Sequence, residues 1–422
     1  MRPFSLINLI GLLFSAAVFA NPQYIKADAL IDVTNGKVIK SPLVEISEGK
    51  VVAVTASKDV PEGADVIDLS GHTLLPGLMD MHVHLTSDAN EHGYKRLNAS
   101  LPRTTLKGVG FAEKTLLAGF TTVRNVGAPG FADVALRDAI NDGELVGPRM
   151  FVAGRSIGVT GGHCDNNLLP FEYGVKSDGV ADGPWAVREK VRENIKFGAT
   201  VIKFCATGGV LSKGTKVGVQ QFTYEEMEAL IDEAHMRGLT VAAHAHGLEG
   251  IKSAIKAGVD SVEHASFIDK EAIKLAKEKG TYLSMDIYVT EYILGEGEKA
   301  GILEESLAKE RTVGKTQRAN FESAVKAGVN MVFGSDAGVY PHGDNPKQFA
   351  RMVKFGMTPL QAIQAATINP AKLLKQDKIL GSVSEGKIAD IIAVKGNPLK
   401  DIELLEKVVF VMKEGQVYKQ PE

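Results

Sequence analysis

Gly77-Leu78-Met79-Asp80-Met81-His82-Val83-His84-Leu85 is an apolar run that carries two histidines at its end. We interpret it as a buried strand. Side chains alternate in direction along a strand, so His82 and His84 point to the same side while Val83 points away. Two imidazoles on one side can bind one metal ion. Paired histidines on a strand also occur as ordinary core or surface residues, so the rest of the chain must decide between these interpretations.

The same order of residues recurs four times later in the chain. An apolar run is followed by a residue that can take part in a metal site, and then by a polar or glycine-rich turn, at Lys203, His244, His264 and Asp336. Each position lies where a buried strand is expected to end. In a (β/α)₈ barrel, reactive groups come from the carboxyl ends of different strands and share one mouth. We therefore predict that these residues meet at the mouth of such a barrel.

These residues also carry a resemblance to a known family, because their order resembles that of the amidohydrolase superfamily of metal-dependent hydrolases. Within the superfamily the chain is most similar to the prolidase-like, imidazolonepropionase-related branch. The resemblance spans nearly the whole chain after its first residues. It rests on the opening stretch and on four further motifs: Val201-Ile-Lys-Phe204, Ala242-Ala-His-Ala-His-Gly247, Val262-Glu-His264 and Phe333-Gly-Ser-Asp-Ala-Gly338.

Strands and helices alternate between residues 77 and 378, which predicts an α/β fold with one (β/α)₈ TIM-type barrel. Helices between the strands have one apolar face, as in 227–234, where Thr223 is a candidate N-cap. Several helices are predicted to stop at a glycine. The eight strands are centred on 79–84, 121–125, 150–153, 200–204, 240–244, 261–264, 282–286 and 330–334.

The two terminal segments have a different pattern, with short alternating strands and turn glycines. Such strands are predicted at 43–46 and 51–54, and again at 388–394 and 408–412. We predict that residues 21–76 and 379–422 together form a small β-sandwich domain beside the barrel, a layout that resembles that of the superfamily. The barrel domain then covers 77–378.

Residues 1–20 are typical of a cleavable signal peptide. Arg2 is followed by an apolar stretch, and Val18-Phe19-Ala20 fits a small-x-small cleavage site. An uncleaved membrane anchor is the alternative. No later run approaches the roughly 18 apolar residues that would span a bilayer. We therefore expect a secreted or periplasmic protein that, once cleaved, has no membrane contact.

Composition excludes some function classes. The 422 residues have a net charge of -3, so there is no basic surface of the kind that binds nucleic acid. We expect a small-molecule or dipeptide substrate as the partner, and self-association into a homo-oligomer stays open. Cys164 and Cys205 are the two cysteines, too few for a disulfide scaffold. Both are placed near the barrel mouth, where one bridge or two free thiols are compatible with the sequence.

Lys203 is the unusual member of the set because an ammonium group cannot bind a cation. An unpaired charge on a buried strand is also costly. In the resembling family, the lysine at this position is carboxylated by CO₂, and the carbamate bridges two metal ions. The alternative is an ordinary lysine paired with a carboxylate such as Asp336. Whether Lys203 is carboxylated therefore decides between a two-metal site and a one-metal site.

The resemblance implies two divalent metal ions, for which zinc is the best match to imidazole and carboxylate ligands. The first ion would be held by His82, His84 and Asp336, and the second by His244 and His264. Lys203 would bridge them. His246 has the same facing as His244, and spacing alone cannot choose between the two. We prefer His244 because it closes an apolar run and matches the family motif, and leave His246 as a residue that could orient a ligand.

The resemblance also implies the chemistry, which is metal-assisted hydrolysis of an amide. A metal-bridging hydroxide attacks the carbonyl, and Asp336 passes the proton to the leaving amine. His163, in a glycine-rich loop after the third strand, is assigned to polarise the carbonyl. Tyr288, after the seventh strand, is assigned to hydrogen-bond the oxyanion or a substrate carboxylate. A solvent-facing loop histidine and an aromatic core residue are the respective alternatives.

The predicted function is a binuclear metal-dependent amidohydrolase that cleaves dipeptides or N-acyl amino acids with a free C-terminal carboxylate. The acidic segment 291–305 would favour a basic C-terminal side chain if it leaned over the mouth; otherwise it is a solvated helix or loop. The main alternative is a mononuclear cyclic amide hydrolase of imidazolonepropionase type, against which Lys203 argues. A non-catalytic periplasmic binding protein on a dead hydrolase scaffold is the alternative from another class.

Overall fold

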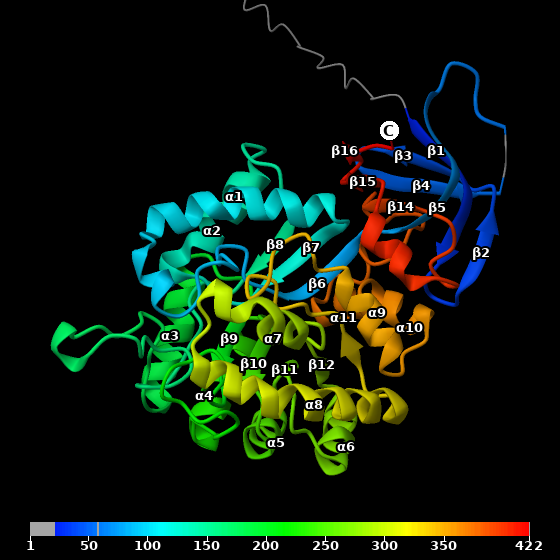
Figure 1. Ribbon diagram of the computed structural model, residues 1–422. Coiled ribbons are helices and arrows are strands. Elements are labelled where there is room, and N and C mark those ends of the chain that lie inside the picture. Colours follow the sequence, from blue (N-terminus) through cyan, green and yellow to red (C-terminus); the bar gives the residue numbers. More distant parts are fainter. Residues whose placement is uncertain (1–21, 57–58, 422) are drawn as a thin grey trace, which may run out of the picture.

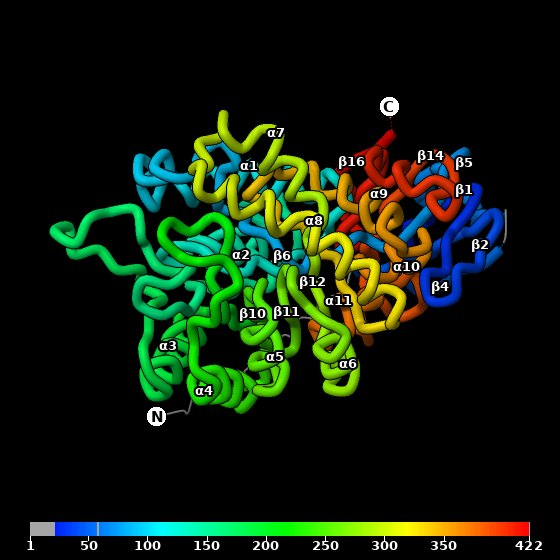
Figure 2. The backbone as a smooth tube through the Cα atoms, turned by 60° about the horizontal axis from the view of Figure 1, so that its bottom comes forward, coloured from blue at the N-terminus to red at the C-terminus, as the bar shows by residue number. Residues whose placement is uncertain are grey.

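A computed structural model describes residues 22–56 and 59–421. The predicted signal peptide, 1–20, lies outside the described residues. Strands from the two ends of the chain gather on one side, and the long middle part fills the rest, as both backbone views show (Figures 1 and 2).

The terminal segments share one sheet of eight strands. Its order is β16-β15-β14-β5-β1-β3-β4, with β2 paired to β1. All four strands predicted from the terminal sequence are present. Val51 N, in the edge strand β4, donates to Lys387 O, just before β14, at 2.8 Å. The edge strand therefore lies against a segment from the other half of the sheet, so the sheet is curled. The strands are β1 (Gln23–Asp32), β2 (Lys37–Lys40), β3 (Leu43–Ser47), β4 (Lys50–Thr55), β5 (Asp65–Pro76), β14 (Ile391–Lys395), β15 (Phe410–Lys413) and β16 (Gln416–Lys419).

Alternating side chains of this sheet form a hydrophobic core of their own. Ile25, Val44, Leu74, Ile391 and Phe410 are among its fully buried members. They come from both ends of the chain, so neither terminal segment can bury its apolar face without the other.

All eight strands predicted for the middle of the chain are present, and neighbouring ones pair in parallel. They form a three-stranded sheet, β6-β7-β8, and a five-stranded sheet, β13-β12-β11-β10-β9. The strands are β6 (Leu78–Val83), β7 (Phe120–Asn125), β8 (Arg149–Val152), β9 (Ile202–Cys205), β10 (Val241–Ala245), β11 (Ser261–His264), β12 (Tyr282–Ser284) and β13 (Met331–Val332).

Backbone hydrogen bonds join the edges of these two sheets. On one side, Val201 N donates to Val152 O at 3.3 Å, and Ile157 N donates to Lys203 O at 2.8 Å. On the other, Met81 N donates to Phe333 O at 2.8 Å. Gly77 permits the tight entry into β6, since a Cβ there would lie 2.1 Å from the Thr121 hydroxyl oxygen.

Helices connect and cover these strands (Figure 1). Helix α4 confirms the predicted cap: the Thr223 side chain accepts from Glu226 N, and Glu226 bonds back to Thr223 N. Gly280 and Gly328 end α6 and α8 with left-handed backbone, as predicted. The helices are α1 (Leu101–Leu117), α2 (Ala132–Asn141), α3 (Pro184–Lys196), α4 (Tyr224–Met236), α5 (Leu248–Lys256), α6 (Lys270–Lys279), α7 (Val289–Ala300), α8 (Glu304–Ala327), α9 (Lys347–Lys354), α10 (Pro359–Ala365) and α11 (Ile368–Leu373), with 3₁₀ turns η1 (Gly93–Asn98), η2 (Pro129–Phe131), η3 (Phe171–Tyr173) and η4 (Ile402–Lys407).

Membrane-spanning character was examined over the described residues. None of their helices is both long enough and apolar enough to cross a bilayer.

Candidate metal centre

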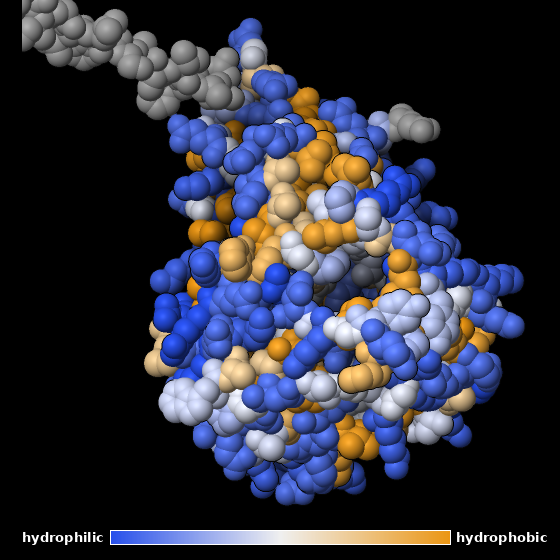
Figure 3. Space-filling model, turned by 90° about the vertical axis from the view of Figure 1, so that its left-hand side faces the viewer, coloured by the Kyte–Doolittle hydropathy of each residue, from blue (hydrophilic) through white to orange (hydrophobic). Residues whose placement is uncertain are grey.

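The carboxyl ends of the eight strands surround one cavity of about 660 Å³. The side of the molecule that lies at the left in Figure 1 is hollowed, as the space-filling view shows (Figure 3). The cavity is lined by all six predicted metal-site residues and by three further histidines: His82, His84, Lys203, His244, His264 and Asp336, with His92, His163 and His246. Strand ends that lie far apart in the sequence therefore deliver their polar side chains to one place.

His82, His84 and Asp336 form the first group of candidate ligands. Asp336 Oδ1 lies 3.4 Å from His82 Nε2 and 3.6 Å from His84 Nε2. The other ring nitrogens face outward, with His82 Nδ1 2.9 Å from Glu263 Oε2 and His84 Nδ1 3.2 Å from Gly127 O. Because these acceptors require Nδ1–H, each Nε2 keeps its lone pair for the centre, which is the arrangement of metal-binding histidines.

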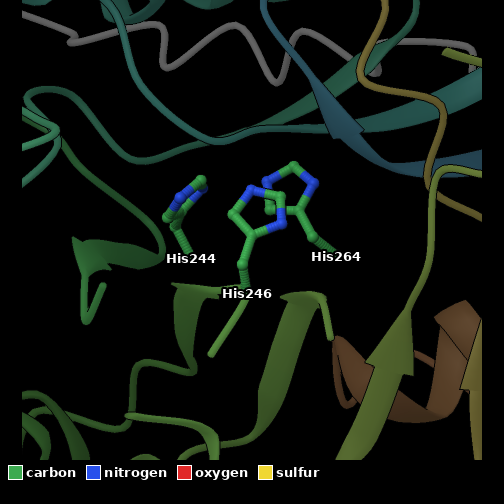
Figure 4. A group of neighbouring side chains, drawn as sticks. All are labelled: His244, His246 and His264. Atoms are coloured by element: carbon green, nitrogen blue, oxygen red, sulfur yellow. The ribbon is translucent and has the colours of Figure 1, made fainter. Parts of the chain in front are cut away.

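His244, His246 and His264 form the second group, with candidate ligand atoms within 4.8 Å of one another. Their rings gather beyond the strand ends (Figure 4). His264 Nδ1 lies 2.8 Å from Asp286 Oδ1, and His246 Nδ1 lies 2.8 Å from Ser266 Oγ. His246 is thus part of this group, and the choice between it and His244 as ligand stays open.

One nitrogen of the second group is buried without any partner. Within the described residues, His244 Nε2 is inaccessible to solvent and makes no hydrogen bond. Burial lowers the pKa of His244 and of His82 well below the usual value, so both rings are neutral. Neutral imidazoles with free lone pairs, next to a carboxylate, fit divalent ions such as zinc.

Lys203, on β9, is 3% exposed, and its charge acts on histidines of both groups, including His82 and His244. The predicted alternative, an ion pair with Asp336, is not formed: within the described residues the Lys203 ammonium makes no hydrogen bond or ion pair. Burial lowers the pKa of Lys203 to about 8, although Glu263 and Asp336 oppose the shift. A larger share of this amine is therefore unprotonated near neutral pH than for an exposed lysine.

Two of the predicted ligands have left-handed backbone. His264 has φ of 69° and Asp336 has φ of 60°, and neither is glycine. Such a conformation costs about 1–3 kcal/mol and is concentrated at functional sites. Here it turns the chain at the ends of β11 and β13. Burial also raises the pKa of Asp336 to about 7, helped by the neighbouring charge of Asp286.

Several residues that support the ligands were not predicted. Arg124 is fully buried and donates from Nη2 to Glu263 Oε1 at 2.7 Å, while Glu263 accepts from His82. Asp286 supports His264, and Asp80 accepts from the backbone N of His82. Asp286 could have been predicted from the sequence, because it follows the seventh apolar run in the same way that the predicted ligands follow the other runs. The link from Glu263 to His82 joins residues 181 positions apart and has no local signal.

Glu263→Gln is expected to weaken metal binding about 10- to 100-fold, because an amide holds the His82 ring less firmly than a carboxylate. Metal affinity measured by competition with a chelator tests this. Glu226→Gln, which changes a buried glutamate of the α4 cap, is the matched control and is expected to leave affinity unchanged. Equal affinity in Glu263→Gln and the wild type would contradict a supporting role for Glu263.

His163 reaches the centre from the loop after β8. Its ring stacks on His244 with 4.0 Å between centroids, and its Nδ1 lies 2.8 Å from Ser212 Oγ. Gly209 allows this position, because a Cβ there would lie 2.4 Å from the His163 ring. The structure thus brings His163 to the candidate site, as the sequence predicted.

Cys164 and Cys205 form a disulfide with 6.0 Å between their Cα atoms. The bridge was one of the two alternatives left open by the sequence. It joins the residue after His163 to the last residue of β9, the strand that carries Lys203. The loop that holds His163 is therefore covalently attached to the strand that carries Lys203.

Replacing both cysteines by serine is expected to cost about 2–5 kcal/mol of unfolding free energy, because the open chain gains conformational freedom. Activity is expected to fall as well, since the His163 loop loses its attachment. Chemical denaturation and steady-state kinetics of the double variant test this. If stability and kcat both equalled those of the wild type, the bridge would neither stabilise the fold nor hold the His163 loop for catalysis.

Tyr288 is the predicted site residue that the structure does not bring to the centre. It is absent from the residues that line the cavity and packs against Tyr340 and the Arg351 guanidinium instead. This environment matches the aromatic core alternative. Tyr288 is the N-cap of α7, which begins directly after it, so its backbone is set by the start of this helix.

Comparison with known proteins gives consistent matches over most of the chain. The amidohydrolase family model matches residues 73–418. Ochratoxinase of Aspergillus niger is 34% identical over 415 residues, covering 92% of this chain and 85% of that protein. The crystal structure of a Xaa-Pro dipeptidase with bound methionine in the active site is 41% identical, with a TM-score of 0.89, and covers 94% of this chain and 100% of that one. Imidazolonepropionase of Shewanella frigidimarina is 24% identical over 390 residues, covering 84% of this chain and 86% of that protein.

Proposed function

Because the chain belongs to the amidohydrolase family, we propose that it is a binuclear metal-dependent hydrolase of dipeptides or N-acyl amino acids with a free C-terminal carboxylate. The resemblance noted from the sequence motifs is confirmed, and the chain is an enzyme of a hydrolase family. The observation that carries the finer proposal is the pair of histidine groups that face Lys203 and Asp336 in one cavity.

One of the matched proteins supports an open-chain amide substrate. A Xaa-Pro dipeptidase by its name acts on dipeptides, and at 41% it is more similar to this chain than imidazolonepropionase, at 24%. The lower identity to imidazolonepropionase agrees with the preference for an open-chain amide over a cyclic one.

The positions of the candidate donor atoms support the proposed ligands. His82, His84 and Asp336 would hold one ion, and His244 and His264 the other, with His246 beside them. Lys203 would bridge the two as a carbamate. Its neutral amine would attack the carbon of CO₂, so that a nitrogen–carbon bond forms while one C=O π bond breaks and its electron pair moves to oxygen. The nitrogen then releases a proton to solvent water, which leaves an anionic carbamate. The low pKa of Lys203 and its lack of an ion pair within the described residues favour this reaction.

Two divalent ions, most suitably zinc, supply Lewis-acid polarisation of the amide and activation of the attacking water. The chain's own residues handle the protons. Asp336, with its carboxylate facing His82 and His84, accepts the proton of the attacking water and delivers it to the leaving amine. His163 is proposed to donate from Nε2 to the substrate carbonyl oxygen, with Ser212 bonded to Nδ1 to hold the ring.

We also propose the arrangement of the whole protein. The parallel strands β6 to β13 would form one closed (β/α)₈ barrel over 77–378, supported by the hydrogen bonds at both sheet edges. The curled terminal sheet would be the β-sandwich domain of 21–76 and 379–422. The sequence of residues 1–20 supports export to the periplasm or the medium.

Metal content and dipeptide hydrolysis test the proposed function together. The purified protein is loaded with zinc, with and without bicarbonate, and assayed on dipeptides with prolyl, arginyl and aromatic C-terminal residues. Two ions per chain and faster hydrolysis with bicarbonate are expected. One ion per chain and no dipeptide cleavage would contradict the proposal and favour a mononuclear cyclic amide hydrolase.

A further inference from the structure

Arg96 is a cation of the cavity lining. It lies in η1, in the loop after β6, and its side chain stays accessible to solvent. Within the described residues, its guanidinium forms no hydrogen bond and no ion pair. Burial among the surrounding residues lowers the pKa of Arg96. An accessible but unpaired guanidinium inside a cavity is suited to binding an anionic group of a ligand.

Other cations of the lining are already engaged. Arg155 Nη1 lies 3.0 Å from Glu193 Oε1, and Lys176 lies 3.4 Å from Asp182 Oδ2. Lys213 donates to a tyrosine hydroxyl at 2.7 Å. Lys203 belongs to the metal centre. Arg96 is therefore the lining cation that remains for a substrate anion within the described residues.

The loop around Arg96 is held in place on both sides. His92 Nε2 donates to Val339 O at 2.8 Å, and Lys95 Nζ donates to Lys299 O at 2.7 Å. Tyr94 accepts the hydrogen bond from Lys213. With its neighbours fixed, Arg96 can bind an anion without first ordering the loop, which reduces the entropy cost of binding.

An apolar wall lies next to this loop. His92 N donates to Ala300 O at 3.2 Å, and a Cβ on Gly93 would lie 2.6 Å from Gly301 O, so the loop packs on the turn between α7 and α8. We define the apolar wall as the cavity-lining aliphatic residues of α7, this turn and α8: Val289, Ile293, Ile302, Leu303 and Val313.

The acidic side chains of the same segment do not line the cavity. Glu291 pairs with Arg351 at 2.8 Å, Glu304 pairs with Arg311 at 2.7 Å, and Glu305 accepts from Gly214 N. Glu296 and Glu298 are also absent from the lining. The segment 291–305 thus lies at the cavity with its apolar side chains, while its carboxylates lie outside the lining and are not placed to bind a basic side chain.

Three carboxyl groups that do line the cavity near these elements are also engaged. Asp88 and Glu91 both pair with Lys107, at 2.9 and 2.5 Å. Glu310 bonds to the Thr290 hydroxyl. Because these carboxyl groups are engaged elsewhere, the cavity beside the wall offers a ligand one positive charge, the Arg96 guanidinium, and an apolar surface, the apolar wall.

We propose that Arg96 binds the C-terminal carboxylate of the substrate and that the apolar wall receives the side chain of that same residue. This inference rests on the proposed function and adds the substrate class: dipeptides and N-acyl amino acids whose C-terminal residue is apolar or aromatic. Arg96 is a specificity-determining residue that contacts the substrate away from the scissile bond.

The test compares free and amidated substrates in a matched pair of variants. Arg96→Met is expected to raise KM for alanyl-phenylalanine about 30- to 100-fold, since one charge-assisted contact is lost, with kcat changed much less. Against alanyl-phenylalanine amide, Arg96→Met and the wild type are expected to perform alike. Arg103→Met, an exposed arginine at the start of α1, is the control and should behave as the wild type on both.

A substrate series tests the wall. The wild type is expected to prefer alanyl-phenylalanine and alanyl-leucine over alanyl-lysine and alanyl-aspartate by about tenfold or more in kcat/KM. Equal losses on the free and the amidated substrate in Arg96→Met, or a preference for lysine, would overturn the inference while leaving the hydrolase intact. Failure of the wild type on every dipeptide would instead overturn the proposed function.

Discussion

Lys203→Ala is expected to lower kcat/KM by about a thousandfold or more and to reduce the metal content from two ions per chain to one or none. The bridging group is the element that both ions would share, and metal stabilisation of the transition state amounts to several kcal/mol. Metal analysis and kinetics on one preparation measure both effects. The loss of both together would distinguish a bridging lysine from one that merely fills space.

A second buried lysine offers a matched control. Lys413 is 5% exposed in the terminal sheet and donates to Gly147 O at 2.9 Å. Lys413→Ala is expected to lower stability without changing the number of ions bound. Two ions per chain and wild-type kinetics in Lys203→Ala would rule out the carbamate bridge.

Asp336→Asn is expected to lower kcat by about 10²- to 10⁴-fold, because the amide cannot accept and return a proton. KM is expected to change only a few-fold, since Asp336 lies among the candidate ligands and is not the residue proposed to bind the substrate carboxylate. Steady-state kinetics on the same dipeptide measure the two constants separately. Asp390→Asn alters a buried carboxylate that pairs with Arg149 at 2.6 Å outside the cavity, and it serves as the control.

The pH profile separates proton transfer from ligand loss in this variant. Burial raises the pKa of Asp336 to about 7 in the metal-free chain, and bound cations would lower it. Below its pKa the carboxyl is protonated and cannot accept the proton, so wild-type kcat is expected to fall as the pH decreases. Asp336→Asn should lack this acid limb. An unchanged acid limb in the variant would assign proton transfer to another group.

The sequence alone was sufficient to predict the strands of the barrel region and the types of residue that line the candidate metal site. Apolar runs of strand length, each closed by a polar residue, are local features, and burial of such runs leaves few alternatives. The eight middle strands were therefore predicted, together with His82, His84, Lys203, His244, His264 and Asp336 as residues that meet. The Thr223 cap was predictable for the same reason, because a capping box involves neighbours three residues apart.

Only the tertiary structure decided which side chains are free and which are engaged. Tyr288 follows its strand as the ligands follow theirs, yet α7 turns it away from the cavity, and Glu291 is drawn to Arg351. Cys164 and Cys205 pair because the loop after β8 folds over β9. Arg96 carries no motif at all. Its significance lies in the absence of a partner within the described residues, and that depends on the packing of segments hundreds of positions apart, which no local pattern encodes.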